Sequence, residues 1–311
     1  MSRNYGLGNR DMSLAGRNAL RAAADRSEIS FAAARSVSER WSQFVAYARN
    51  HGVNKMERID RATVIDYGRG LADAVRSGEM SASRAQTLVS SINTVMRLAN
   101  PGWDSVGAVR DCGVPQRSAI RDTPPPDRDS YQRAVDALRQ AGDERGASVA
   151  ELAREFGLRS KEASLVDAKA ALAEARERGA ISVEIGTKGG REREIELSHP
   201  DRQIAVLERA AAAQGDDRAL IPAHLNWHQW QQNGLREVRD VVRECTGGGL
   251  HDLRAAYAVE RYADLTGTPA PVIGGAVTCD RELDREARLM ISEELGHGRV
   301  DVVAEYIGGR R

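Results

Sequence analysis

A segment rich in proline and glycine interrupts this chain of 311 residues between Asn100 and Asp129. It ends in the run Pro124-Pro-Pro126. A proline has no backbone N–H and its ring clashes with the preceding helical turn, so a helix cannot continue through such a run. The chain also exceeds the usual size of a single hydrophobic core. We therefore expect two domains joined by a proline-rich linker at residues 113–128.

The part before this linker has the periodicity of amphipathic helices, because its apolar residues recur at three- and four-residue steps. Ser81 precedes one such set and is a candidate helix cap. We expect an all-helical domain at residues 27–112, preceded by a basic N-terminal arm at residues 1–26. The residues that carry these two expectations are Phe31, Val37, Trp41, Phe44, Val45 and Ala48 in one helix, Val64, Tyr67, Leu71 and Val75 in the next, and Arg3, Arg10, Arg17 and Arg21 in the arm.

The part after the linker, residues 129–311, begins with helical patterns near residues 130–141 and 148–156. A β-hairpin is predicted next, because apolar residues alternate on both sides of the turn Gly186-Thr-Lys-Gly-Gly190. From Arg202 onward the pattern is mostly helical again. The expected fold is mainly α with a small antiparallel β-sheet. The alternating residues are Ile181, Val183 and Ile185 before the turn and Ile195 and Leu197 after it.

Charge is unevenly distributed, although 45 basic and 45 acidic side chains cancel over the whole chain. Through Asp122 there are 18 Lys plus Arg against 12 Asp plus Glu, an excess of six positive charges. The N-terminal part is therefore the expected site of phosphate attraction. The three cysteines are far apart and lack metal-ligand spacing, which indicates a reducing, cytoplasmic compartment and no metal site. No apolar run approaches the roughly 20 residues of a membrane span, so we expect no membrane contact.

Tyr306 near the C-terminus follows His297 by nine residues. A tyrosine hydroxyl is a poor nucleophile at neutral pH, because its unperturbed pKa is about 10. It needs cations around the electrophile and a nearby group that takes its proton. Upstream residues supply candidates for both needs.

Three upstream motifs carry these candidates. Arg159 stands at a helix edge with Glu162 one turn later, where a carboxylate can orient a guanidinium that binds phosphate. Lys188 occupies the hairpin turn and is a candidate general acid. His251 and Arg254 open a helix after a glycine run, where the helix dipole favours anions. Each motif alone has a simpler interpretation as a surface ion pair, a turn lysine or helix packing.

Together and in this order, the motifs resemble those of the tyrosine recombinase family, the phage-integrase type of site-specific DNA recombinase. The opening segment, which begins at Arg3, is similar to that of a branch of the family found on integrative and mobile elements. The resemblance implies an all-helical, SAM-like core-binding domain followed by a catalytic domain. The matching boxes are Gly157-Leu-Arg159 with Glu162, Thr187-Lys188-Gly-Gly, His251-Asp-Leu-Arg254, Leu295-Gly-His297 and Tyr306.

The resemblance also implies roles for these residues. Arg159 and Arg254 would hold the scissile phosphate, and Glu162 would hold the Arg159 guanidinium in orientation. Tyr306 would attack phosphorus to give a 3′-phosphotyrosyl link. Lys188 would protonate the leaving 5′ oxygen, His251 would act as acid and base on the tyrosine side, and His297 would donate a hydrogen bond to the phosphate. No metal or other cofactor is expected.

The partner implied by the resemblance is double-stranded DNA at specific sites, bound by a homo-tetramer that integrates or excises a mobile element. A directionality or DNA-bending factor stays open as a further partner. Two alternatives also stay open, a DNA-binding accessory protein of the same fold and a topoisomerase-like enzyme that nicks and religates one strand. The sequence assigns no role to residues 266–294, nor any trans contact to the short C-terminus. Arginines on the N-terminal helices that are candidates for phosphate contact are Arg40, Arg69, Arg84 and Arg97.

Overall fold

The computed structural model describes residues 3–310, and it divides into two compact units after Ser118. The division falls inside the proline-rich segment at residues 113–128. Val114 is buried in the first unit, whereas Pro124, Pro125 and Pro126 lie against the second. The segment between the units is therefore short.

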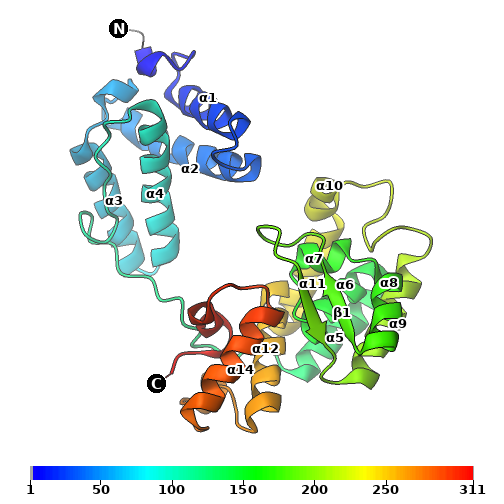
Figure 1. Ribbon diagram of the computed structural model, residues 1–311. Helices are drawn as coiled ribbons and strands as arrows, with labels where there is room; N and C mark the ends of the chain where they lie inside the picture. Colours follow the sequence, from blue (N-terminus) through cyan, green and yellow to red (C-terminus); the bar gives the residue numbers. More distant parts are fainter. Residues whose placement is uncertain (1–2, 311) are drawn as a thin grey trace. The chain divides into compact units, whose positions relative to one another are not determined.

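The first unit is all-helical, as its periodicity predicts (Figure 1). Side-chain caps fix where its helices begin: Ser30 accepts a hydrogen bond from the Ala33 amide, and Ser81 accepts one from the Arg84 amide. The predicted cap at Ser81 is thus confirmed. The elements are η1 (Arg3–Gly6), α1 (Met12–Asp25), α2 (Phe31–Asn50), η2 (Met56–Arg58), α3 (Arg61–Arg76) and α4 (Ala82–Ala99).

Helix α1 lies within the segment that we assigned to a basic arm, and it packs into the core of the first unit. Met12, Ala15 and Leu20 are buried there. The Trp41 indole donates a hydrogen bond to the Met12 carbonyl, with 2.8 Å between nitrogen and oxygen. The arginines of this helix are therefore presented from a packed helix, while Met1 and Ser2 lie outside the described residues.

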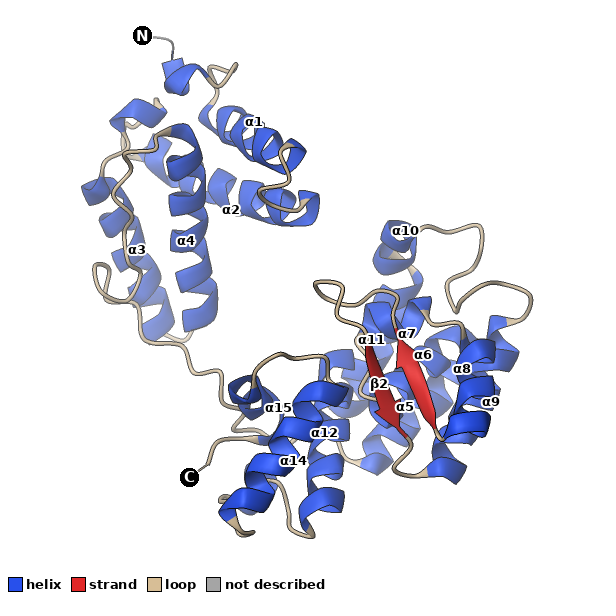
Figure 2. Cartoon of the chain, viewed as in Figure 1, coloured by secondary structure: helices blue, strands red, loops and turns tan. Residues whose placement is uncertain are grey.

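The second unit contains a two-stranded antiparallel sheet with helices behind and beside it in the view of Figure 2. In the sheet Ile181 pairs with Ile195, and both side chains are buried. This hairpin confirms the expected fold class, although its strands are shorter than the alternation suggests: Ile185 is 60% exposed beyond the first strand. The elements are α5 (Arg128–Gln140), α6 (Glu144–Glu155), α7 (Ser160–Leu165), α8 (Ala168–Arg178), β1 (Ala180–Val183), β2 (Arg193–Glu196), α9 (Pro200–Gln214), α10 (Trp227–Gln232), α11 (Gly234–Thr246), α12 (Leu250–Thr266), α13 (Pro271–Gly274), α14 (Arg281–Glu294), η3 (Val300–Val303) and α15 (Ala304–Ile307).

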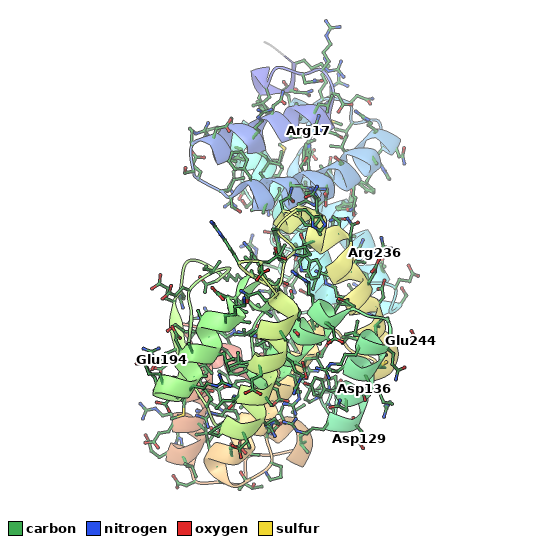
Figure 3. All side chains as sticks on the ribbon, turned by 90° about the vertical axis from the view of Figure 1, so that its right-hand side faces the viewer. Arg17, Asp129, Asp136, Glu194, Arg236 and Glu244 are labelled. Carbon is green, nitrogen blue, oxygen red and sulfur yellow. The ribbon has the colours of Figure 1, made fainter. Side chains whose placement is uncertain are left out.

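Two hydrophobic clusters hold the second unit together. The larger one joins α5, α6 and α11 to the sheet, and the smaller one joins α12, α14 and α15. Helix α11 shows the pattern well, because Leu235 and Val242 are buried while Arg236 and Glu244 are exposed (Figure 3). No helix within residues 3–310 is long and apolar enough to cross a membrane.

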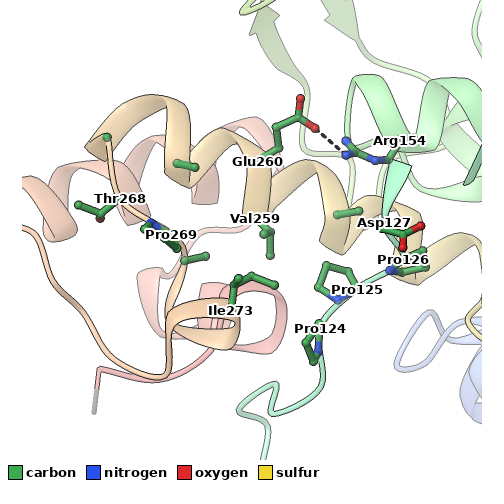
Figure 4. A pocket seen from close by; sticks show the side chains of 14 residues that line it. Pro124, Pro125, Pro126, Asp127, Arg154, Val259, Glu260, Thr268, Pro269 and Ile273 are labelled. Carbon is green, nitrogen blue, oxygen red and sulfur yellow. Dashed lines mark hydrogen bonds and ion pairs between the residues drawn. The ribbon is translucent and has the colours of Figure 1, made fainter. Parts of the chain in front are cut away.

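A pocket of about 660 Å³ opens on one side of α12 (Figure 4). Its walls come from the proline run, from Val259 of α12 and from Ile273 of α13, so its lining is mainly apolar. Thr268 and Pro269, in the loop after α12, also line it. Residues after α12, for which the sequence predicted no role, therefore form part of the wall of this pocket.

Candidate active site

The candidate active site is built around the buried guanidinium of Arg254, whose side chain is fully inaccessible to solvent. Arg254 donates hydrogen bonds to the carbonyls of Gly157 and Leu295. Burial lowers the pKa of Arg254 to about 10; Tyr306 opposes this shift and Arg159 adds to it. The group therefore still carries its charge at neutral pH.

Gly157 must be a glycine for this arrangement to form. Its φ is +60°, and a Cβ atom there would lie 2.6 Å from Cδ1 of Tyr257. The left-handed backbone with no side chain lets the Gly157 carbonyl approach Arg254. It also turns the chain into Arg159, the N-cap residue of α7.

Arg159 and Arg193 contact the same buried carboxylate, that of Glu162. Arg159 Nη1 lies 2.7 Å from Glu162 Oε1, and Arg193 Nη2 lies 2.8 Å from Oε2. Arg254 Nη1 is 3.7 Å from Oε2. Burial raises the pKa of Glu162, but these arginines outweigh burial and bring it to about 2. Glu162 is therefore ionised and anchors three cations.

The C-terminal end of α14 accepts hydrogen bonds from the same arginines. The Leu295 carbonyl accepts from Arg159 and Arg254, and the Glu294 carbonyl accepts from Arg193. The last carbonyls of a helix lack partners within the helix and carry its partial negative charge. Guanidinium groups satisfy them here, which fixes the loop that leads to His297.

Tyr306 lies beside this cluster, on the short helix α15, and is 2% exposed. Its hydroxyl is 3.0 Å from His297 Nε2, and the Arg254 guanidinium lies 5.6 Å from the centre of its ring. His297 Nε2 also contacts Arg254 Nη2 at 3.4 Å. Tyrosine, histidine and arginine thus meet at one point, as the order of their motifs predicts.

His251 borders Tyr306 from the exposed start of α12, with 5.3 Å between the two ring centres. Surrounding protein, followed by the charge of Arg254, lowers the pKa of His251 below its ordinary value. The next residue, Asp252, accepts a hydrogen bond from the Gly249 amide at 2.8 Å and one from Arg121 Nη2 at 2.8 Å. These contacts fix the start of α12.

Lys188 is the one candidate from the catalytic set that stays apart from the cluster among the described residues. It lies on the exposed turn between β1 and β2, and no hydrogen bond or ion pair within residues 3–310 joins it to the others. Its charge nevertheless contributes to the low pKa of His297. The hairpin therefore presents Lys188 near the site on a solvent-exposed turn, and such turns are usually more mobile than the strands that they connect.

Two residues of the site were missed in the sequence analysis. Arg193 enters through the sheet register, which pairs it with Val183 and directs it to Glu162. Arg121 enters through a contact with Asp252, 131 positions away. The run Arg191-Glu-Arg-Glu194 after the hairpin turn was a visible but ambiguous signal, because any of its charges suits an exposed strand.

The four arginines proposed for DNA contact lie on the first unit. Arg84 and Arg97 are exposed on α4, and Arg40 is half-buried on α2. Arg69 on α3 pairs with Asp66 at 3.3 Å, and both side chains are more than 60% exposed. Such exposed pairs contribute little to stability. Their role in DNA contact stays a prediction.

The low pKa of His297 predicts an acid-sensitive fold. Burial and then Arg254 lower this pKa from 6.5 to about 4. Between these values the unfolded chain binds more protons than the folded one, so stability present above about pH 6.5 is lost as the pH falls toward 4. We expect His297→Gln to remove on the order of 2 kcal/mol of this pH dependence. Urea unfolding of both proteins at pH 7 and pH 4.5 measures it, and equal pH dependence would contradict the assignment.

The sequence of residues 123–260 matches the family described as Integrase. This segment belongs to the integrase family. It contains Arg159, Lys188, His251 and Arg254 and ends before His297 and Tyr306. A comparison with curated proteins gives no match.

Solved structures similar to this chain have the tyrosine recombinase fold. XerH site-specific recombinase bound to palindromic difH substrate has a TM-score of 0.59 at 13% identity, covering 96% of this chain and 82% of that one. A lambda integrase tetramer bound to a Holliday junction has 0.56 at 16%, covering 90% and 72%. The Tn1549 transposon integrase with transposon right end DNA has 0.57 at 8%, covering 95% of both. At these identities the likeness establishes the fold.

Proposed function

We propose that this protein is a site-specific DNA recombinase that cleaves and rejoins DNA through a 3′-phosphotyrosyl intermediate, integrating or excising a mobile element. The observation that carries the proposal is the excess of positive charge beside Tyr306. Arg159, Arg193 and Arg254 share the carboxylate of Glu162, so two positive charges are left over among these described residues. A phosphodiester carries one negative charge and would neutralise one of them, and the second would face the negative charge that builds up on the phosphate oxygens during attack.

The donors at this point also suit a phosphate. Arg254 Nε is buried and has no hydrogen-bond partner among the described residues. A buried donor without a partner carries a free-energy cost of about 1–3 kcal/mol, which a bound phosphate oxygen would remove. Preorganised N–H donors stabilise the charge that builds up on phosphate oxygens during attack.

In the proposed reaction the Tyr306 oxygen attacks phosphorus and the bond from phosphorus to the 5′ oxygen breaks. The DNA is then joined to tyrosine through its 3′ phosphate. Lys188 supplies the proton for the departing 5′ oxygen. A 5′ hydroxyl from another strand later attacks the phosphotyrosine, which restores a phosphodiester and releases the tyrosine.

The proton of Tyr306 needs an acceptor, and the sequence motifs led us to assign this step to His251. The described contacts favour His297, because its Nε2 lies 3.0 Å from the tyrosine oxygen. We therefore propose His297 as the first acceptor. His251, whose ring is next to the same tyrosine, is the alternative.

The similar structures support DNA as the partner and a tetramer as the assembly. They are complexes of XerH with a difH substrate, of a lambda integrase tetramer with a Holliday junction, and of the Tn1549 integrase with transposon right end DNA. The first unit adds bulk attraction, since residues 1–118 carry 17 basic and 11 acidic side chains. We propose that a homo-tetramer in the cytoplasm acts on two duplexes.

Strand exchange tests the proposal against its two alternatives. The protein first selects a duplex from a random library, and two labelled duplexes of different length that carry this site are then incubated with it. Recombinant products of mixed length support the recombinase. Nicking and religation without exchange would support a topoisomerase-like enzyme, and binding without cleavage would support an accessory protein.

Lys188→Ala tests the proposed general acid. We expect cleavage of ordinary DNA to slow by about 10²–10⁴-fold, the usual contribution of a positioned proton donor. In a substrate with sulfur in place of the 5′ oxygen, the leaving group is a thiolate. Its conjugate thiol has a pKa of about 8.5, so the thiolate departs without needing a proton. The variant should cleave it at close to the native rate. Lys169→Ala is the control, because Lys169 is an exposed residue of α8. An equal defect on both substrates would exclude the role.

A further inference from the structure

Helix α14 lies between the motifs His251-Asp-Leu-Arg254 and Leu295-Gly-His297 and has an unusual inward face. Asp284 and Arg288 are only 2% and 3% exposed, whereas Leu283 and Met290 of the same helix are 36% and 41% exposed. A helix that packs by hydrophobic burial alone shows the reverse pattern. Burial of apolar surface therefore does not explain why Asp284 and Arg288 face inward.

Asp284 connects three parts of the chain. Its Oδ1 accepts hydrogen bonds from the Tyr262 hydroxyl at 2.9 Å and from Arg288 Nε at 2.7 Å. Its Oδ2 lies 2.9 Å from Arg310 Nε. One buried carboxylate thus joins α12, α14 and the chain that follows Tyr306.

Arg288 contacts that same chain directly. Its Nη1 donates to the Gly308 carbonyl, two residues after Tyr306, across 3.2 Å. Gly308 has a φ of +90°, and a Cβ atom there would lie 2.8 Å from the Val272 nitrogen of α13. The backbone at Gly308 is therefore held between α13 and Arg288.

Hydrogen bonds also hold the chain that precedes Tyr306. Ser292 Oγ of α14 donates to the carbonyls of His297 at 3.2 Å and Arg299 at 3.1 Å, and the Arg121 amide donates to the Ala304 carbonyl at 2.9 Å. Helix α15 has only four residues, too few to be stable by itself. Its position, and that of the Tyr306 hydroxyl, is set by these outside contacts.

We propose that Asp284 and Arg288 are positioning residues for the nucleophile: they clamp Gly308 and Arg310 in the same chain and so hold the Tyr306 hydroxyl against His297 and Arg254. The inference rests on the proposed function and assigns a role to the segment at residues 266–294. Arg288 acts through the backbone of Gly308 and does not touch the reacting atoms. A buried ion pair contributes little net stability compared with apolar packing, but its geometry is specific.

Arg288→Met tests the clamp, because methionine fills a similar space without donating to Gly308 or Asp284. We expect cleavage by the DNA-bound variant in a single turnover to slow by about 10²-fold, the scale of a 1 Å displacement of a reacting group. DNA affinity should stay native. Arg285→Met is the matched control, because Arg285 lies on the exposed face of α14 and pairs only with Glu282 at 2.7 Å among the described residues.

A second readout does not depend on activity. With 3-fluorotyrosine at position 306, the ¹⁹F resonance should shift or broaden in Arg288→Met and match the native resonance in Arg285→Met. Asp284→Asn, which keeps the shape and weakens both pairs, should give an intermediate effect and replaces Arg288→Met if that protein fails to fold. A native ¹⁹F resonance in the folded clamp variants would overturn the inference, whether or not their unfolding midpoints fall. Absence of cleavage by the native protein would instead count against the proposed function, and the resonance would still decide the clamp.

Discussion

Replacing Arg254 with alanine is expected to slow DNA cleavage by roughly 10²–10³-fold or more, the cost of removing one preorganised donor at a developing negative charge. Arg254 is the buried centre of the site and contacts Gly157, Leu295 and His297. Its removal deletes a donor to phosphate. It also leaves two buried carbonyls without these hydrogen bonds, so the variant should be less stable by a few kcal/mol.

Arg254→Lys separates charge from geometry. Lysine keeps the positive charge, but its ammonium cannot span the Gly157 and Leu295 carbonyls and also present a fork to a phosphate. We therefore expect a cleavage defect nearly as large as that of alanine with a smaller loss of stability. Single-turnover cleavage at saturating DNA measures the first, and urea unfolding measures the second.

Arg285→Ala is the control for Arg254, because it removes the same charge from an exposed position of α14. It should cleave DNA at the native rate. A folded Arg254→Lys protein with native cleavage would contradict the assignment of the guanidinium fork to the phosphate. A loss of DNA binding in proportion to the loss of cleavage would also contradict it, since the interaction is proposed to act mainly on the reacting state.

Local signals made much of the fold predictable. The proline-rich segment contains the division between the units because proline interrupts the interior of a helix. Ser81 marks a helix start because its hydroxyl accepts a hydrogen bond from a backbone amide that has no partner within the helix. The glycine run before His251 ends one helix and opens another. These features depend on a few neighbouring residues, which is why the sequence shows them.

Contacts between distant residues could not be predicted in the same way. Arg193 reaches Glu162 only through the pairing of β2 with β1. The charged inward face of α14 contradicts hydrophobic periodicity, so no pattern indicates that Asp284 faces Arg310. Likewise, motif spacing does not specify which histidine lies within hydrogen-bond distance of the Tyr306 hydroxyl, which in the structure is His297 at 3.0 Å. The acid–base role of His251 stays a prediction.

Tyr306→Phe is expected to abolish covalent attachment to DNA completely, because phenylalanine has no oxygen to attack phosphorus. The substitution removes one hydrogen bond, to His297, and keeps the ring. Its cost in stability should be about 1 kcal/mol, so the variant should fold and bind DNA. Tyr131→Phe is the matched control, because it removes a hydroxyl from another buried tyrosine of the same unit, on α5.

The measurement that tests the central claim is covalent trapping on a nicked duplex that carries the selected site. Native protein and Tyr131→Phe should give a denaturant-resistant adduct whose phosphate maps to the peptide containing Tyr306, and Tyr306→Phe should give none. An adduct that persists in Tyr306→Phe, or no adduct from native protein on DNA that it binds, would contradict the account.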